Sequence, residues 1–261
     1  MLLAIDAGNT NTVFAVLTDD GETEGQWRIS TDIRRTSDEY AVWLIQLMAL
    51  RGLTQDDVGA CILASVVPGA TDHLVRLCAE HFGGAPFQVR ADDPRLGIEV
   101  LLTNPKEAGA DRIVNAISAR ARYKTPLVVV DIGTATNFDV VDRNGNFCGG
   151  VIAPGPQPSV DALQRIAAKL PRIEIERPAS VIGLGTIPAM QSGVFWGYVG
   201  LIEGLIERIA AEIGEPITVI GTGGLARLYQ QATSKIDHID PDITIRGLYL
   251  IYQAIAAEGK S

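Results

Sequence analysis

Apolar and polar positions follow the same order twice along this chain. Each half opens with an apolar run, at Leu2–Ile5 and at Leu127–Val130, and a short polar turn that contains glycine follows it. A second apolar run comes next, at Val13–Leu17 and at Phe138–Val141. Short apolar runs bounded by turn residues are typical of buried strands, so each half predicts a β-hairpin.

The remaining pattern predicts further strands and helices in a similar order. The expected strands lie at 26–30, 60–67, 87–89, 136–142, 147–153 and 217–220, and the expected helices at 37–50, 68–82, 104–123, 159–169 and 189–213, with two more at the end. Strand meanders followed by alternating strands and helices, present twice, predict an α/β fold with helices on both faces of the sheets. We divide the chain into an N-terminal half, 1–123, and a C-terminal half, 124–261.

The two hairpin turns carry related polar signatures. They read Asp6-Ala7-Gly8-Asn9-Thr10-Asn11-Thr12 and Asp131-Ile132-Gly133-Thr134-Ala135-Thr136-Asn137. Glycine lets a backbone approach closely, and successive N–H groups with hydroxyl and amide side chains can bind phosphate. The aspartate can hold a cation or its water shell. One such turn is equally well an ordinary hairpin, but two favour a duplicated domain that holds a nucleotide between its halves.

Composition narrows the possible partners. A net charge of −9 argues against a nucleic-acid binder and against an anionic membrane surface. No apolar stretch reaches membrane-spanning length, and the first residues resemble a strand rather than a signal peptide. Three scattered cysteines predict free thiols in a reducing compartment, so we expect a cytoplasmic protein.

Two further segments carry candidate chemistry. Within Gly109-Ala110-Asp111-Arg112, Asp111 can act as a general base and Arg112 as an anion clamp, although two solvated helix charges are the plainer interpretation. The segment Gly221-Thr222-Gly223-Gly224 ends a predicted strand, and its glycines allow a flat ligand to approach. A simple strand-to-helix turn is the alternative there.

Glycines recur along the predicted helix at 189–213. Gly193, Gly197, Gly200 and Gly204 are unfavourable inside a helix, which indicates that another element packs closely against that face. The packing element is either another helix of the same chain or a twin helix from a second subunit, with Trp196 and Tyr198 as anchors.

Six segments, in the same order and over nearly the whole chain, carry a resemblance to a known family. They are Asp6–Thr12, Gly109–Ala116, Asp131–Thr136, Ala189–Gly193, Trp196–Gly204 and Thr222–Ala226. In these segments the chain resembles the type III pantothenate kinases. The resemblance implies a duplicated actin-like, ribonuclease H-like ATPase fold, with two halves around a nucleotide cleft. It also implies ATP-dependent phosphorylation of pantothenate to 4′-phosphopantothenate, the first step of coenzyme A biosynthesis.

The resemblance also implies cofactors, an assembly and residue roles. It implies a homodimer that uses Mg²⁺ and a monovalent cation, K⁺ or NH₄⁺. Asp111 is the implied proton acceptor, and Asp131 the implied monovalent-cation ligand; we also assign Asp6 to Mg²⁺. The implied ATP contacts are Asp6, Ala7, Gly8, Asn9, Thr10, Asn11, Thr12, Val13 and Thr134, and we add Gly223 to them. The implied pantothenate contacts are Gly109, Ala110, Asp111, Arg112 and, across the dimer, Thr186.

A few positions depart from the family pattern, and they lie around the expected substrate pocket. Asn137 replaces a usual threonine, Leu102 replaces a frequent tyrosine, and Leu184 stands where a polar or basic residue is common. Pro156 and Pro158 predict a stiffened loop. These departures leave two alternatives open: a kinase of the same fold that acts on another small hydroxy compound, or a catalytically weak regulatory or binding protein.

Overall fold

The chain forms two compact units, each built on a five-stranded sheet. The computed structural model describes residues 1–166 and 170–258. The first unit comprises Met1–Ala121 together with the residues from Asp242 onward, and the second comprises Arg122–Pro241. No helix within the described residues is long and apolar enough to cross a membrane.

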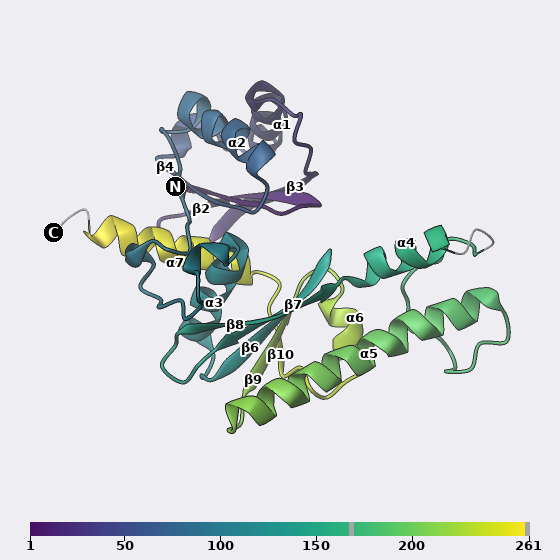
Figure 1. Cartoon of the computed structure of the whole chain (residues 1–261). Helices are drawn as coiled ribbons and strands as arrows, with labels where there is room; N and C mark the ends of the chain where they lie inside the picture. Colours follow the sequence, from purple (N-terminus) through teal and green to yellow (C-terminus); the bar gives the residue numbers. More distant parts are fainter. Residues whose placement is uncertain (167–169, 259–261) are drawn as a thin grey trace. The chain divides into compact units, whose positions relative to one another are not determined.

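The first sheet combines an antiparallel meander with two parallel strands. Strands β1, β2 and β3 form the meander, and β4 and β5 extend the sheet from β1 in parallel, which gives the order β3-β2-β1-β4-β5. Figure 1 labels β2, β3 and β4 of this sheet. Their bounds are Leu2–Ala7, Asn11–Leu17, Thr23–Ser30, Ala60–Ser65 and Phe87–Gln88. The carboxyl ends of β1 and β4 therefore lie side by side, with Ala7 opposite Ser65.

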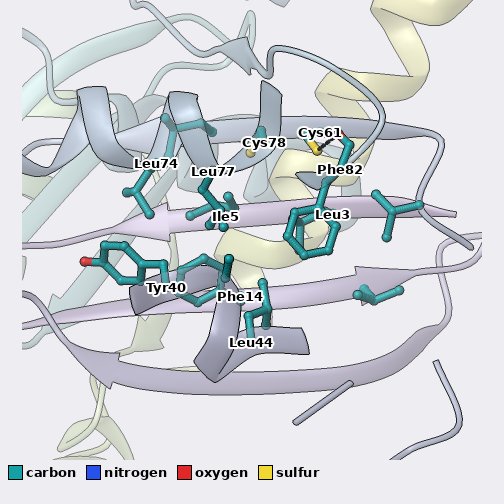
Figure 2. Packing of buried hydrophobic residues seen from close by; sticks show 14 of the residues in the cluster. Leu3, Ile5, Phe14, Tyr40, Leu44, Cys61, Leu74, Leu77, Cys78 and Phe82 are labelled. Atoms are coloured by element: carbon teal, nitrogen blue, oxygen red, sulfur yellow. Dashed lines mark hydrogen bonds between the residues drawn. The ribbon is translucent and has the colours of Figure 1, made fainter. Parts of the chain in front are cut away.

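Helices α1 (Ser37–Ala49) and α2 (Pro68–His81) cover one face of this sheet. Alternate residues of β1, Leu3 and Ile5, point into a core that both helices complete, and Figure 2 shows these side chains interdigitating. The predicted capping box at Thr36 is present, because its hydroxyl accepts from the Glu39 N–H. Since β1 side chains alternate, its even-numbered residues, Asp6 among them, lie on the opposite face.

Two predictions for the first unit need correction. Asn104 caps only a short 3₁₀ turn, Pro105–Glu107, and the long helix α3 begins later, as Ala110–Arg122. The closing helix α7 (Ile243–Glu258), which the division at residue 123 placed in the second half, packs against β1 and β4 of the first unit. Its fit is close, because a side chain at Gly247 would overlap the backbone of Val114 in α3.

The second sheet repeats the topology of the first. Its order is β10-β9-β6-β7-β8, with β6, β7 and β8 as the meander and β9 and β10 parallel to β6. The bounds from β6 to β10 are Leu127–Ile132, Ala135–Val141, Phe147–Pro154, Thr218–Thr222 and His238–Ile239. Val128, Val130 and Ile132 of β6 point into a core formed with α5 and α6, as alternate residues of β1 do in the first unit. The predicted duplication is confirmed at the level of strand order.

Two helices of the second unit, those predicted at 159–169 and 189–213, begin earlier than the pattern predicts. Helix α4 is Pro156–Ile166, α5 is Thr186–Ile213 and α6 is Ala226–Gln230. Pro156 and Pro158 therefore belong to the first turn of α4 and not to a stiffened loop, since the first helical positions need no intrahelical N–H partner. The predicted end of that helix, 167–169, lies outside the described residues.

Candidate active site

The first hairpin turn presents polar residues at the carboxyl end of β1. The Gly8 N–H donates to the Asn11 carbonyl over 3.0 Å, and the Thr31 N–H donates to the Thr10 carbonyl over 3.0 Å. Asn9, Thr10 and Asn11 are exposed. A closed turn with exposed polar residues is suited to binding an anionic group.

Asp6 is the next-to-last residue of β1, beside this turn, and is half-buried. Its neighbours on the adjoining strands are Val13 on β2 and Ala64 on β4, both apolar. Registered neighbours on adjacent strands share a face, so hydrocarbon flanks this carboxylate across the sheet.

Asp111 lies in the first turn of α3. One carboxylate oxygen accepts the Arg112 backbone N–H over 2.8 Å, and burial raises the pKa of this carboxyl above the ordinary aspartate value. A carboxylate with a raised pKa is a stronger base than an ordinary aspartate, and such groups are candidates for general-base chemistry.

Gly109 connects Asp111 to the edge of the first sheet. A Cβ at Gly109 would lie 2.5 Å from the Asp111 Oδ1 atom and 3.3 Å from the Val66 Cγ1 atom, so the glycine sits between these two side chains. The Val66 N–H in turn donates to the Ala7 carbonyl over 3.1 Å. Asp111 is therefore held near the strand ends that also carry the Asp6 turn.

Asp131 has a more polar environment in the second unit. Its neighbours on the adjoining strands are Asn137 on β7 and Thr222 on β9. Gly223 closes over it with φ +90°, and a Cβ there would lie 2.5 Å from the Asp131 Oδ1 atom and 2.6 Å from the Ile132 carbonyl oxygen. Only glycine fits this position, and the two neighbours of Asp131 across the sheet both carry side-chain oxygens.

The second hairpin turn is one residue shorter than the first. The Gly133 N–H donates to the Ala135 carbonyl over 3.0 Å, and the Gly155 N–H donates to the Thr134 carbonyl over 3.0 Å. A side chain at Gly155 would overlap the carbonyl oxygens of Gly133 and Thr134. Gly133 and Thr134 are exposed, as the polar residues of the first turn are.

Thr186 begins α5 and lies in a groove that α4 and α5 form within the second unit. The groove encloses about 750 Å³ and is mainly apolar. Exposed hydrophobic residues precede it in sequence, and Leu184 is 98% exposed. Residues that line the groove include Leu163, Met190, Gly193, Gly197 and Tyr198.

The predicted site residues therefore fall into three groups. The Asp6–Val13 turn and Gly109–Arg112 belong to the first unit, Asp131, Thr134 and Gly223 gather at one edge of the second sheet, and Thr186 lies on the groove. Sequence reasoning missed Thr31, Val66 and Gly155. Each of these residues directly follows a strand and belongs to no motif. The one available signal is positional: Thr31 and Gly155 both follow the third strand of their half.

Comparison with known proteins identifies the family. The profile of the type III pantothenate kinases matches residues 2–208. The chain belongs to the type III pantothenate kinase family.

Individual relatives agree with this assignment. A Rhodospirillum centenum protein named type III pantothenate kinase is 61% identical over 98% of this chain and 100% of its own length. A Rhodospirillum rubrum protein of the same name is 55% identical over 97% of this chain and 98% of its own length. The resemblance drawn from the six segments is thereby confirmed, and the chain is a phosphotransferase of this family.

A solved structure confirms the fold. The activator of 2-hydroxyisocaproyl-CoA dehydratase from Clostridium difficile, solved with bound ADPNP, aligns over 100% of this chain and 97% of its own length. The TM-score is 0.59 at 14% identity, a likeness that concerns the fold alone. The predicted duplicated, actin-like ATPase fold is confirmed.

We expect Gly109→Ala to impair catalysis without unfolding the protein. The new methyl group would meet the movable end of the Asp111 side chain, so the carboxylate would be displaced while the backbone stays in place. A misplacement of about 1 Å can lower a rate by about 10²-fold. The turnover rate and the melting temperature of the variant test this.

Gly59→Ala is the matched control for this substitution, because a Cβ at Gly59 meets no described atom within 4 Å. An unchanged rate in Gly109→Ala would show that the position of the Asp111 carboxylate does not limit catalysis.

Proposed function

We propose that this chain transfers the γ-phosphoryl group of ATP to the primary hydroxyl of pantothenate, which yields 4′-phosphopantothenate and ADP in the first step of coenzyme A biosynthesis. The observation that carries the proposal is the half-buried Asp111 carboxylate, with its raised pKa, at the same sheet edge as the Asp6 turn. Family membership supplies the substrate.

Each group in the first unit has a defined task in this reaction. The Asp111 carboxylate accepts the proton of the substrate hydroxyl, whose oxygen bonds to the γ-phosphorus as the bond to the ADP oxygen breaks. The exposed turn at Asn9, Thr10 and Asn11 binds the phosphates of ATP. Arg112 grips the pantothenate carboxylate with its planar guanidinium, and the backbone of Gly109 and Ala110 completes the contact.

The two strand-end aspartates fit different cations. Asp6, flanked by Val13 and Ala64, offers a single hard oxygen group, which suits Mg²⁺ that keeps most of its water shell. Asp131 has the side-chain oxygens of Asn137 and Thr222 beside it, which suits a monovalent cation such as K⁺ or NH₄⁺. These cations supply positive charge against the phosphates. Thr134 and Gly223, at the same edge as Asp131, complete the nucleotide contacts of the second unit.

A homodimer accounts for the exposed face of α5. Gly193, Gly197 and Gly200 are exposed, and a Cβ at any of them meets no atom of the described residues within 4 Å. Within the described part of this chain, no helix packs closely on these glycines, so the twin helix of a second copy is the better explanation of their spacing. The apolar groove and the exposed Leu184 beside it support this, since exposed apolar patches mark interaction surfaces. Thr186 would then reach the partner's substrate.

Product analysis tests the proposed reaction directly. We expect 4′-phosphopantothenate by mass spectrometry when the protein, ATP, Mg²⁺ and pantothenate are combined, with faster formation in K⁺ than in Na⁺. Phosphorylation of another alcohol and not of pantothenate would favour a different kinase of this fold. Nucleotide binding with no phosphorylated product would favour a regulatory role.

We expect Asp111→Asn to lower kcat by about 10²- to 10⁴-fold while ATP binding is retained, because general-base catalysis contributes about that factor. The fold should persist. Burial raises the pKa of Asp111, so ionisation of this group opposes folding as the pH rises above its unfolded pKa, and asparagine removes that cost. Asparagine also keeps an oxygen that can accept the Arg112 N–H.

The pH profile gives the same prediction a second readout. The base must be ionised, so the wild-type kcat/KM should fall as the pH decreases through the raised pKa of Asp111, at a higher pH than an ordinary aspartate would give. This acidic limb should vanish in Asp111→Asn. A near-normal rate in the variant, or an unchanged limb, would remove Asp111 from the proton transfer.

We expect Gly197→Leu to separate the dimer and lower activity without reducing the stability of the protomer. Leucine is the better helix former by about 0.8 kcal/mol, and a Cβ at Gly197 meets no described atom within 4 Å. Light scattering, kcat and melting temperature measure the three effects. Gly59→Leu, at an exposed position with equal space, is the control. A monomeric wild-type protein with full activity would contradict the dimer.

A further inference from the structure

Thr31 makes three hydrogen bonds around the first hairpin turn. It follows β3, and its backbone N–H donates to the Thr10 carbonyl over 3.0 Å. Its hydroxyl donates to the Gly8 carbonyl over 2.7 Å and lies 2.9 Å from the Thr12 hydroxyl. One residue from outside the turn therefore contacts the turn at three places.

Counting hydroxyl protons fixes the direction of these bonds. A threonine hydroxyl has one proton, and the Thr31 proton goes to the Gly8 carbonyl, which can only accept. The Thr12 hydroxyl must then donate to Thr31. Thr12 is fully buried, so its proton supports the frame of the turn and is not available to a phosphate oxygen in this arrangement.

The bond to Gly8 also orients an N–H group of the turn. In a planar trans peptide, the carbonyl of one residue and the N–H of the next point in opposite directions. Because the Gly8 carbonyl points to the Thr31 hydroxyl, the Asn9 N–H points away from Thr31, and Asn9 is exposed. The hydroxyl of Thr31 thus sets the direction of a main-chain donor at the turn that we assign to ATP.

The second unit lacks this hydroxyl at the matching position. Gly155 follows β8 and donates its N–H to the Thr134 carbonyl, as Thr31 does to Thr10. Thr136, which corresponds to Thr12, is also fully buried, but its hydroxyl has no hydrogen-bond partner among the described residues. Both turns share the backbone bond, and only the first has the side-chain bonds.

We propose that Thr31 is a positioning residue of the ATP site, which acts through the Gly8 carbonyl and Thr12 to orient the phosphate-binding turn. This rests on the proposed function in one respect, the assignment of ATP phosphates to the Asp6–Val13 turn. Thr31 itself touches no substrate in this scheme, so its loss should affect nucleotide binding and leave pantothenate binding unchanged.

Substitution of Thr31 by valine and by serine tests the proposal. Valine keeps the shape and removes the hydroxyl, so Thr31→Val should raise the Kd for ADPNP and the KM for ATP about 10-fold, with the KM for pantothenate unchanged. Thr31→Ser keeps the hydroxyl and should restore near wild-type values. Thr12→Val removes only the second bond, so it should weaken ADPNP binding less than Thr31→Val does.

Thr233→Val is the matched control, because it deletes a partly buried hydroxyl that donates to Glu203 over 2.7 Å in the second unit. It should leave the Kd for ADPNP unchanged. Melting temperatures show whether each variant is folded at the assay temperature. If Thr31→Val does not fold, Thr12→Val and Thr31→Ser still give a nucleotide-specific comparison.

Several results would overturn the proposal. The first is ADPNP binding as tight as in the wild type in Thr31→Val or, if that variant does not fold, in Thr12→Val. The second is an equal weakening of ADPNP binding in Thr31→Ser and Thr31→Val. The third is a parallel rise in the KM for ATP and the KM for pantothenate. Failure of the proposed function is a separate result: a wild-type protein that binds ADPNP but does not phosphorylate pantothenate would refute the reaction, while the effect of Thr31 on ADPNP binding could still be measured. A wild-type protein that binds no nucleotide would refute both.

Discussion

In each unit one backbone hydrogen bond ties the first hairpin turn to the end of the third strand, and the position of the polar residues depends on this bond. In both units the residue that follows the third strand donates its N–H to a threonine carbonyl in the turn, at Thr10 and at Thr134. The hairpin puts the polar signature at the carboxyl edge of the sheet, where α/β folds bind their ligands, and the bond fixes the turn against the end of the meander.

The two units use this shared frame differently. In the first, the Thr31 hydroxyl adds bonds to the turn, and the strand-end aspartate has apolar neighbours. In the second, Gly155 allows a closer approach of the backbone, and Asp131 lies in a row with Asn137 and Thr222. These differences give a physical reason to assign the two aspartates to different cations, which the near-identical signatures do not provide.

Much of the fold could be predicted from the sequence because its signals are local. Apolar runs marked the strands, and the Thr36 capping box marked the start of α1. Signals that depend on distant contacts were misjudged. Asn104 and Pro105 resemble a helix start, so the pattern predicts the start of α3 too early. The fit of α7 against Val114 joins residues far apart in sequence, so no local signal places α7 with the first unit.

The motifs that predict the candidate site are also local. The motifs predict the segments around Asp6, Asp111 and Asp131, since glycine and acidic residues at strand or helix ends can be recognised in the sequence alone. The burial that raises the pKa of Asp111, and the proton count that commits Thr12 to Thr31, depend on three-dimensional neighbours. No sequence spacing reveals such contacts.

A crystal structure with ADPNP, Mg²⁺ and pantothenate tests the central claim most directly. The distance to measure joins the Asp111 carboxylate and the primary hydroxyl of pantothenate. We predict hydrogen-bond contact at about 2.6–3.2 Å, with the γ-phosphate of ADPNP against the Asp6–Val13 turn. A pantothenate hydroxyl that lies beyond the reach of Asp111, or phosphates that do not touch this turn, would contradict the account.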